Sequence, residues 1–240
     1  MLLGGSRSKI AGLVPLKEGS VVLDVGSGDG EFAFAFARKP EVKQVVGLEP
    51  VRKWVFEAVE KARQKKLDGK VSFLVQKFPS RKLKGKSFDA VVFFLSLCDL
   101  LRSRKLSFEK VVKECGAVLK ENGFLVFAEE FEEDLQSESD KLGVEINKAL
   151  GYEYFPLAGL VGELEANGFK VLENKVFEAR SELLGIEDLQ RFLGDELELC
   201  RTDKTFTEKM SKIFEEFKPR VEEFGFRINP RIRAIICQKI

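Results

Sequence analysis

The stretch SVVLDVGSGDGEFAF, residues 20–34, decides the fold. It begins as an apolar run that reaches the acid Asp24, and three glycines follow at alternate positions, Gly26, Gly28 and Gly30. Such a loop lets the backbone approach a ligand closely, and a helix that follows it offers free N–H groups. The stretch therefore predicts a buried strand, a ligand-binding turn and a helix.

The segment after the loop, EFAFAFAR at residues 31–38, alternates as a strand would. It follows the glycine loop directly, however, and the next strand candidate begins near Val42. Because position after such a loop outweighs a short period-two pattern, we predict a buried helix here.

Further apolar runs alternate with helical segments along the first half of the chain. Strands are predicted at 21–25, 44–49, 71–76, 90–96 and 123–130, and helices at 51–66 and 106–120. Ser107 is the expected N-cap of the second helix, and Glu-Asn-Gly at 121–123 is expected to close it. Strands that alternate with helices indicate βαβ units and a parallel sheet.

The pattern changes after residue 140. We predict a helix at 157–168, a strand at 169–179, two amphipathic helices near 186–199 and 205–224, and a final strand within INPRIRAIICQKI. Pro219 is expected to end or kink the second amphipathic helix. The chain is thus predicted to be a single domain, 1–240, with a helical insertion at about 181–228 between its last two strands.

Composition excludes several classes of function. The chain has 240 residues, a net charge of +1 and 44% hydrophobic residues, which suits one sizeable core and gives no global attraction to nucleic acid or membranes. The absence of histidine excludes a histidine base, and four well-separated cysteines predict buried thiols and no metal site. No signal peptide or membrane span is recognisable, so a cytoplasmic location is expected. Abundant Lys, Glu and Phe point to an archaeal or thermophilic source.

The loop itself distinguishes between nucleotide ligands. A dinucleotide fingerprint needs its third glycine where this chain has Glu31, and acids at Asp24 and Glu31 would repel a pyrophosphate. S-adenosylmethionine carries a sulfonium and an ammonium, which such acids favour. Glu49, 25 positions after Asp24 at the end of the second strand, is placed to accept hydrogen bonds from a ribose diol.

Four runs together resemble the class I S-adenosylmethionine-dependent methyltransferases: VVLDVGSGDG, GLEP, SFDAVVFFLSLCDL (87–100) and VVKECGAVLKENGFLVFAEE (111–130). The resemblance covers roughly residues 8–178. It implies an α/β fold, a three-layer Rossmann-like domain whose seven-stranded sheet is mostly parallel with an antiparallel last strand, here with a small helical cap. It also implies S-adenosylmethionine as cofactor.

The resemblance implies cofactor-binding roles for nine residues. Asp24, Gly26, Gly28 and Gly30 would surround the methionine part, Glu49 would hold the ribose, Gln76, Lys77 and Phe78 would border the adenine, and Phe94 would contact the amino group through its backbone. The chain departs from the family at Lys77, where an acid often reaches the adenine amino group. It also lacks the [DN]PP[YFW] motif that accompanies methylation of a base or a glutamine amide.

Candidates for a catalytic base lie at the strand ends. We expect Asp99, Glu129 and Tyr154 to be catalytic, and Glu130 is a further candidate base. Tyr152 and Tyr154, in the loop after the fifth strand, would orient a substrate. The alternatives are that Asp99 caps a helix and that the acidic run 129–134 is solvated.

The expected activity is methyl transfer to a small-molecule acceptor by in-line displacement. Alternatives are an RNA or protein methyltransferase that uses the basic segment 61–86, a non-catalytic S-adenosylmethionine-binding subunit that supports a partner, and, less well supported, a dehydrogenase. Nucleic acid is not the expected partner, because the basic segment has few aromatic residues for base stacking and reads as solvated charge. The sequence contains no indication of the oligomeric state.

Overall fold

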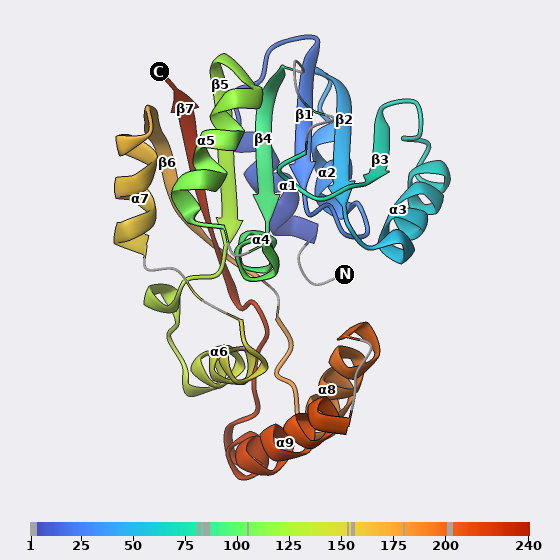
Figure 1. Cartoon of the computed structure of the whole chain (residues 1–240), viewed down its shortest axis with the longest axis vertical. Coiled ribbons are helices and arrows are strands. Elements are labelled where there is room, and N and C mark those ends of the chain that lie inside the picture. Colours follow the sequence, from blue (N-terminus) through green and yellow to red (C-terminus); the bar gives the residue numbers. More distant parts are fainter. Residues whose placement is uncertain are drawn as a thin grey trace.

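The structure, a computed structural model, describes residues 4–80, 83, 87–104, 106–152, 154, 157–179, 181–200 and 204–240. Seven strands form one sheet in the order β3-β2-β1-β4-β5-β7-β6 (Figure 1). The strands are β1 Ser20–Val25, β2 Val42–Glu49, β3 Val71–Val75, β4 Phe88–Phe94, β5 Leu119–Glu129, β6 Phe169–Glu178 and β7 Arg231–Lys239. β1 to β5 pair in parallel, whereas β7 is antiparallel to both β5 and β6. The predicted mostly parallel sheet with an antiparallel last strand is confirmed.

Helices cover both faces of this sheet. One face carries α1 Gly4–Leu13, α2 Glu31–Ala37 and α3 Arg52–Gln64, and the other carries α4 Leu97–Arg104, α5 Phe108–Val118 and α7 Leu157–Ala166 (Figure 1). Every residue of α2 from Phe32 to Ala37 is buried, which confirms the helix predicted for the alternating segment. The alanines let α2 lie close to the sheet while its phenylalanines fill the core.

Three helices form a cap beyond the carboxyl ends of the parallel strands (Figure 1). They are α6 Glu138–Leu150, α8 Ile186–Cys200 and α9 Lys204–Phe224, and they share an apolar cluster of their own. α9 continues past Pro219 to Phe224, so the proline does not end the helix as the sequence suggested it might. Phe217 and Val221 on either side of it are buried in the cap, and this packing offsets the lost backbone hydrogen bond.

The end of α5 also differs from the prediction. Ser107 caps the helix as expected, since its side chain accepts a hydrogen bond from the Lys110 N–H at 3.2 Å. The helix stops at Val118, however, and Leu119 already pairs with Phe88 as the first residue of β5. The predicted terminator at 121–123 instead lies within the strand, with Asn122 at a φ of 61°.

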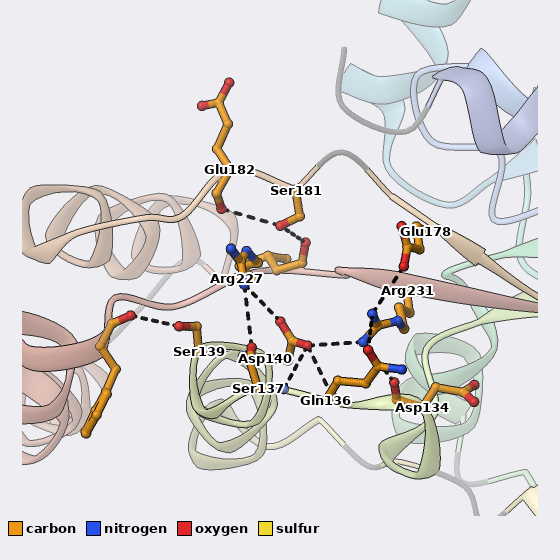
Figure 2. Close-up of polar contacts among 12 residues, drawn as sticks. Asp134, Gln136, Ser137, Ser139, Asp140, Glu178, Ser181, Glu182, Arg227 and Arg231 are labelled. Carbon is orange, nitrogen blue, oxygen red and sulfur yellow. Dashed lines mark hydrogen bonds and ion pairs between the residues drawn. The ribbon is translucent and has the colours of Figure 1, made fainter.

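A polar network ties the cap to the sheet (Figure 2). Asp140 and Ser137 form a capping box at the start of α6, and the Asp140 carboxylate also accepts hydrogen bonds from Arg227 and Arg231, each at 3.4 Å. Burial alone would raise the pKa of Asp140, but hydrogen bonds from Ser137, the Gln136 N–H and Arg227 outweigh it, so the pKa lies below its ordinary value. The network fixes the segment 227–231, which leads from the cap back to β7.

No helix among the described residues is long and apolar enough to cross a membrane. Cys115 and Cys237 are buried and Cys98 is half-buried, while the side chain of Cys200 lies outside the described residues.

Candidate functional site

Two adjoining cavities open at the carboxyl edge of the parallel strands. The larger, of about 700 Å³, lies over β1, β2 and β4, and the smaller, of about 230 Å³, lies between β5 and the cap. Leu95, Asp99 and Tyr152 line both. Ligands of open α/β sheets bind at this edge, so the two cavities together are the candidate site.

Asp24 lies at the inner end of the larger cavity. Its side chain is only 1% exposed, and its Oδ2 atom has no hydrogen-bond partner. Burial raises the pKa of Asp24 to about 7, against the opposing effects of the Ala33 N–H and the Arg7 charge. A buried carboxyl oxygen without a partner is unfavourable, so this atom is prepared for a ligand that donates hydrogen bonds.

The three loop glycines have different surroundings. Gly26, at a φ of 70°, faces Ser96 so closely that a Cβ atom would lie 2.5 Å from the Ser96 Cβ. Gly28, at a φ of 51°, has open space beside it and lines the larger cavity. Gly30 is not among the lining residues, and a Cβ atom there would meet Phe73 and Phe34 at 2.7 and 2.8 Å. Gly30 therefore shapes the turn from behind.

Glu49 ends β2 with a fixed carboxylate. It is 7% exposed, its Oε2 accepts from the Gly28 N–H at 3.0 Å, and its Oε1 accepts from the Val51 N–H at 2.9 Å. Burial raises the pKa of Glu49 despite these two bonds, which favour the charged form. Each carboxylate oxygen keeps a lone pair for a ligand hydroxyl on the cavity side.

The remaining cofactor candidates border the same cavity. Gln76, Lys77 and Phe78 line it after β3, and Phe94 lines it at the end of β4. Trp54 of α3 also lines the cavity. This tryptophan was not predicted as a site residue, and its place in the first turn of α3, five positions after Glu49, is the signal that would have found it.

Arg7 was missed by the sequence analysis. It lies on α1, lines the larger cavity, and holds its guanidinium carbon 4.8 Å from the centroid of the Phe94 ring. Its Nε is buried without a hydrogen-bond partner. Burial lowers the pKa of Arg7, against the charges of nearby acids such as Asp24. No motif surrounds this residue, so only the fold brings it to the site.

Glu129 and Glu130 both line the smaller cavity, with different partners. The Glu129 Oε1 accepts from the backbone N–H groups of Ser96 and Leu97, at 3.1 and 3.0 Å, and so anchors the start of α4. Burial raises the pKa of Glu129 to about 8, despite these two bonds. The acidic run at 129–134 is therefore not simply solvated at its first two positions, since both side chains are buried.

Glu130 is held by Tyr154. The Tyr154 hydroxyl donates to the Glu130 Oε2 at 3.0 Å and accepts from the Asn147 side-chain amide at 3.0 Å. The other carboxyl oxygen, Oε1, is buried without a partner. Burial raises the pKa of Glu130 to about 7, and burial beside this acid raises the pKa of Tyr154 above its usual range. Tyr154 therefore stays a neutral phenol.

The cap supplies the far wall of the smaller cavity. Phe192 comes from α8, and Ile228 and Asn229 come from the segment that the Asp140 network fixes. On the near wall, Leu95 takes a φ of 52°, an uncommon conformation for a side chain of this size. It is held there by the hydrogen bond from its N–H to the Ala128 carbonyl at 2.9 Å.

Comparison with known proteins identifies the family. A family model described as "Methyltransferase domain" matches residues 16–176, which is more than half of the chain. This chain belongs to the class I S-adenosylmethionine-dependent methyltransferases. The cofactor of this methyltransferase is S-adenosylmethionine. No curated protein matches its sequence.

Solved structures share the fold of this methyltransferase. A putative methyltransferase from Bacillus halodurans is similar at a TM-score of 0.64 and 19% identity, covering 98% of this chain and 97% of that one. A Geobacter sulfurreducens S-adenosylmethionine-dependent methyltransferase, solved with S-adenosylhomocysteine, is similar at a TM-score of 0.64 and 13% identity. The match covers 98% of this chain and 91% of that one. The [4+2]-cyclase SpnF is similar at a TM-score of 0.64 and 20% identity, and the match covers 98% of this chain and 80% of that one. At these identities the likeness concerns the fold alone.

The basic segment of the methyltransferase, 61–86, is partly neutralised within the chain. Lys61 pairs with Asp29, Lys65 lies 3.4 Å from Glu31, and the Lys70 ammonium donates to the backbone carbonyls of Ala37 and Lys39. Lys82 and Lys84, which belong to this basic segment, lie outside the described residues.

Proposed function

We propose that this methyltransferase transfers the methyl group to a small molecule bound in the smaller cavity, by in-line displacement. One observation carries the proposal. The cofactor-sized cavity and the smaller one meet at Leu95, Asp99 and Tyr152, and the smaller one contains a buried carboxyl with an unpartnered oxygen. A cavity of about 230 Å³ behind such a junction suits a small acceptor better than a macromolecular chain.

The charged side chains that line the larger cavity are complementary to the charged groups of the cofactor. Asp24 offers an unpartnered carboxyl oxygen and Arg7 an unpartnered Nε, which match the ammonium and the carboxylate of an amino-acid end. Glu49 is positioned for the ribose hydroxyls. The residues proposed to hold the rest of the cofactor are those of the predicted loop and strand-end set that line the cavity, which leaves out Gly30: Gly26, Gly28, Gln76, Lys77, Phe78 and Phe94. When bound, S-adenosylmethionine supplies a methyl group on a positively charged sulfur.

The chain contributes alignment, exclusion of water and a proton acceptor. We assign the proton acceptor to Glu130, which lines the smaller cavity, called the acceptor cavity below, and whose buried Oε1 has no hydrogen-bond partner. Among the three expected catalytic residues, Glu129 positions α4 through its two backbone hydrogen bonds, and Tyr154 positions Glu130. Asp99 lies where the cavities meet, and its place there suits a contact with both ligands.

Calorimetry followed by a transfer assay tests this function. We expect the protein to bind S-adenosylmethionine and S-adenosylhomocysteine and not NAD, and then to label a small molecule from methyl-tritiated cofactor. Binding of NAD alone would overturn the assignment. Cofactor binding without transfer to any of a broad panel of amines, phenols, thiols and carboxylates would favour a non-catalytic subunit. Salt-sensitive labelling of RNA, or labelling of protein, would contradict a small-molecule acceptor. The cytoplasmic location and the heat-adapted source stay predictions.

A further inference from the structure

The acceptor cavity is lined by both apolar and acidic side chains. Leu97, Phe131 and Leu160 contribute apolar surface, whereas Asp99, Glu129 and Glu130 contribute carboxyl groups. Among the described residues that line it there is no lysine or arginine. An acidic lining by itself specifies no ligand, whereas the hydrogen bonds that each carboxyl oxygen already makes determine what can still bind to it.

Glu130 is the acid whose hydrogen bonding is incomplete. Glu130 is 7% exposed. Its Oε2 already accepts a hydrogen bond from the Tyr154 hydroxyl, while its Oε1 is buried without a partner. The Asn147 amide donates to the Tyr154 oxygen, so the tyrosine must direct its single proton at Glu130. This chain of bonds fixes the carboxyl plane and leaves without a partner one buried oxygen of a residue that lines the cavity. Glu129, in contrast, has its Oε1 committed to two backbone N–H groups.

The charge of the lining selects among molecules that could donate to that oxygen. A carboxylate or phosphate ester would meet no described cation, and once the pH exceeds the pKa of Glu130, about 7, it would also meet an ionised carboxylate that repels it. An alcohol can donate one hydrogen bond but brings no charge to compensate the acids. An ammonium group supplies both the donor and the compensating charge, and the apolar walls accommodate the hydrocarbon that carries it.

Resting on the proposed function above, we infer that the methyl acceptor is a small amine with an apolar body, whose N–H is bound by the Glu130 Oε1 and whose proton Glu130 removes. The amine enters as an ammonium ion. One N–H bond breaks, the proton forms an O–H bond with Glu130, and the electron pair stays on nitrogen as a lone pair. That lone pair would form the bond to the methyl carbon as the carbon–sulfur bond of the donor breaks, with S-adenosylhomocysteine as the leaving group. After the product leaves, Glu130 returns the proton to water. The pKa of Glu130, raised to about 7 by burial, suits a group that takes and returns a proton near neutral pH.

Matched fragments test this inference on the full chain loaded with S-adenosylhomocysteine. Benzylamine, benzyl alcohol and benzoate share one ring and differ in the polar group, and cyclohexylmethylamine with its alcohol and acid forms a second set. We expect calorimetry to show that the amines bind at least about tenfold more tightly than the matched alcohols and acids. Amine affinity is expected to rise as the pH increases through about 7, because Glu130 must be ionised to hold the cation.

Two variants and one control complete the test. Glu130→Gln keeps the side-chain size, loses the charge, and is expected to weaken amine binding about tenfold and to flatten its pH dependence. Tyr154→Phe leaves the acid but removes its positioning bond, and is expected to weaken amine binding to a smaller extent. The control is Glu132→Gln, an exposed acid paired with Lys148 outside the cavity, which should bind amines like the wild type.

The outcomes separate the two proposals. Amines that bind no better than the acids, or amine affinity unchanged in Glu130→Gln, would overturn the inference while S-adenosylhomocysteine binding remains. Failure of the wild type to bind S-adenosylhomocysteine at all would instead overturn the proposed function. Unchanged S-adenosylhomocysteine affinity in each variant shows that it has folded.

Discussion

The Cα atom of Gly143 lies against the backbone carbonyl of Arg227. A Cβ atom built on Gly143 would come within 1.8 Å of that carbonyl oxygen, a separation that no side chain can have. Gly143 sits in the middle of α6, and Arg227 begins the segment that the Asp140 network holds (Figure 2). This close approach sets the distance between α6 and the segment that carries Ile228 and Asn229 to the acceptor cavity.

Gly143→Ala is therefore expected to destabilise the cap. The added methyl group must push the 227–231 segment away, at a loss of at least about 1–3 kcal/mol in the free energy of unfolding. Thermal and urea unfolding measure this loss. The matched control is Gly162→Ala in α7, where a Cβ atom meets nothing within 4 Å, so alanine should stabilise the helix by about 0.5–1 kcal/mol. Equal effects of the two substitutions would contradict the contact.

Glu49→Ala is expected to weaken cofactor binding. The substitution removes the proposed hydrogen bonds to the ribose and also releases the N–H groups of Gly28 and Val51. A loss of about 1.5–3 kcal/mol in the binding free energy of S-adenosylhomocysteine is expected by calorimetry. Glu182→Ala, at an exposed acid outside both cavities, is the control. Wild-type affinity in the Glu49 variant would contradict the ribose assignment.

Cofactor binding is expected to release a proton from Asp24. In the free protein burial raises the pKa of Asp24 to about 7, so the group is largely protonated at about pH 6. A bound ammonium stabilises the carboxylate and lowers this pKa, which expels the proton. Well above pH 7 Asp24 is already ionised in the free protein, so cofactor binding should release no proton from it at about pH 8.5. Calorimetry in two buffers of different ionisation enthalpy measures the proton count.

Asp24→Asn provides the control for this prediction. The variant cannot titrate at this position, so it should release no proton at about pH 6 and should bind more weakly. 5′-Deoxy-5′-methylthioadenosine, which lacks the amino-acid end, should release no proton even from the wild type. A release that persists in the variant would assign the proton to another group.

Arg7→Met is expected to weaken binding of the amino-acid end only. Loss of a charge-assisted hydrogen bond to the cofactor carboxylate should reduce S-adenosylhomocysteine affinity by about 1.5–3 kcal/mol. Binding of 5′-deoxy-5′-methylthioadenosine should not change, because it has no carboxylate. Arg38→Met, at an exposed arginine that follows α2, should leave both affinities unchanged. An equal loss for both ligands would mean that Arg7 supports the fold of the cavity.

The fold and the structure of the glycine loop were predictable because their signals are local. The apolar runs and the glycine loop of residues 20–34 specify strand, turn and helix within a few residues, and the order of these units fixes the sheet. The helix α6 was not predicted, although a local signal exists. Ser137 and Asp140 stand three positions apart before an apolar run, which is the spacing of a capping box.

The roles within the acceptor cavity were beyond the sequence. Glu129 and Glu130 are neighbours of the same residue type, and only contacts with distant segments distinguish them. Glu129 accepts hydrogen bonds from the backbone N–H groups of Ser96 and Leu97, whereas Glu130 accepts one from the Tyr154 hydroxyl. Arg7 was missed for the same reason, because its function depends on where α1 lies against the sheet and not on its neighbours in the chain.

The division of the site between two cavities has a consequence for how this enzyme can diverge. Apart from Tyr152, the larger cavity is built from residues up to Leu100, whereas the smaller one takes most of its wall from Glu129 onward. On the proposed function, mutations from Glu129 onward would therefore change acceptor choice while the larger cavity is inherited unchanged. The same partition makes the region after β5 the natural unit to exchange when a new specificity is engineered.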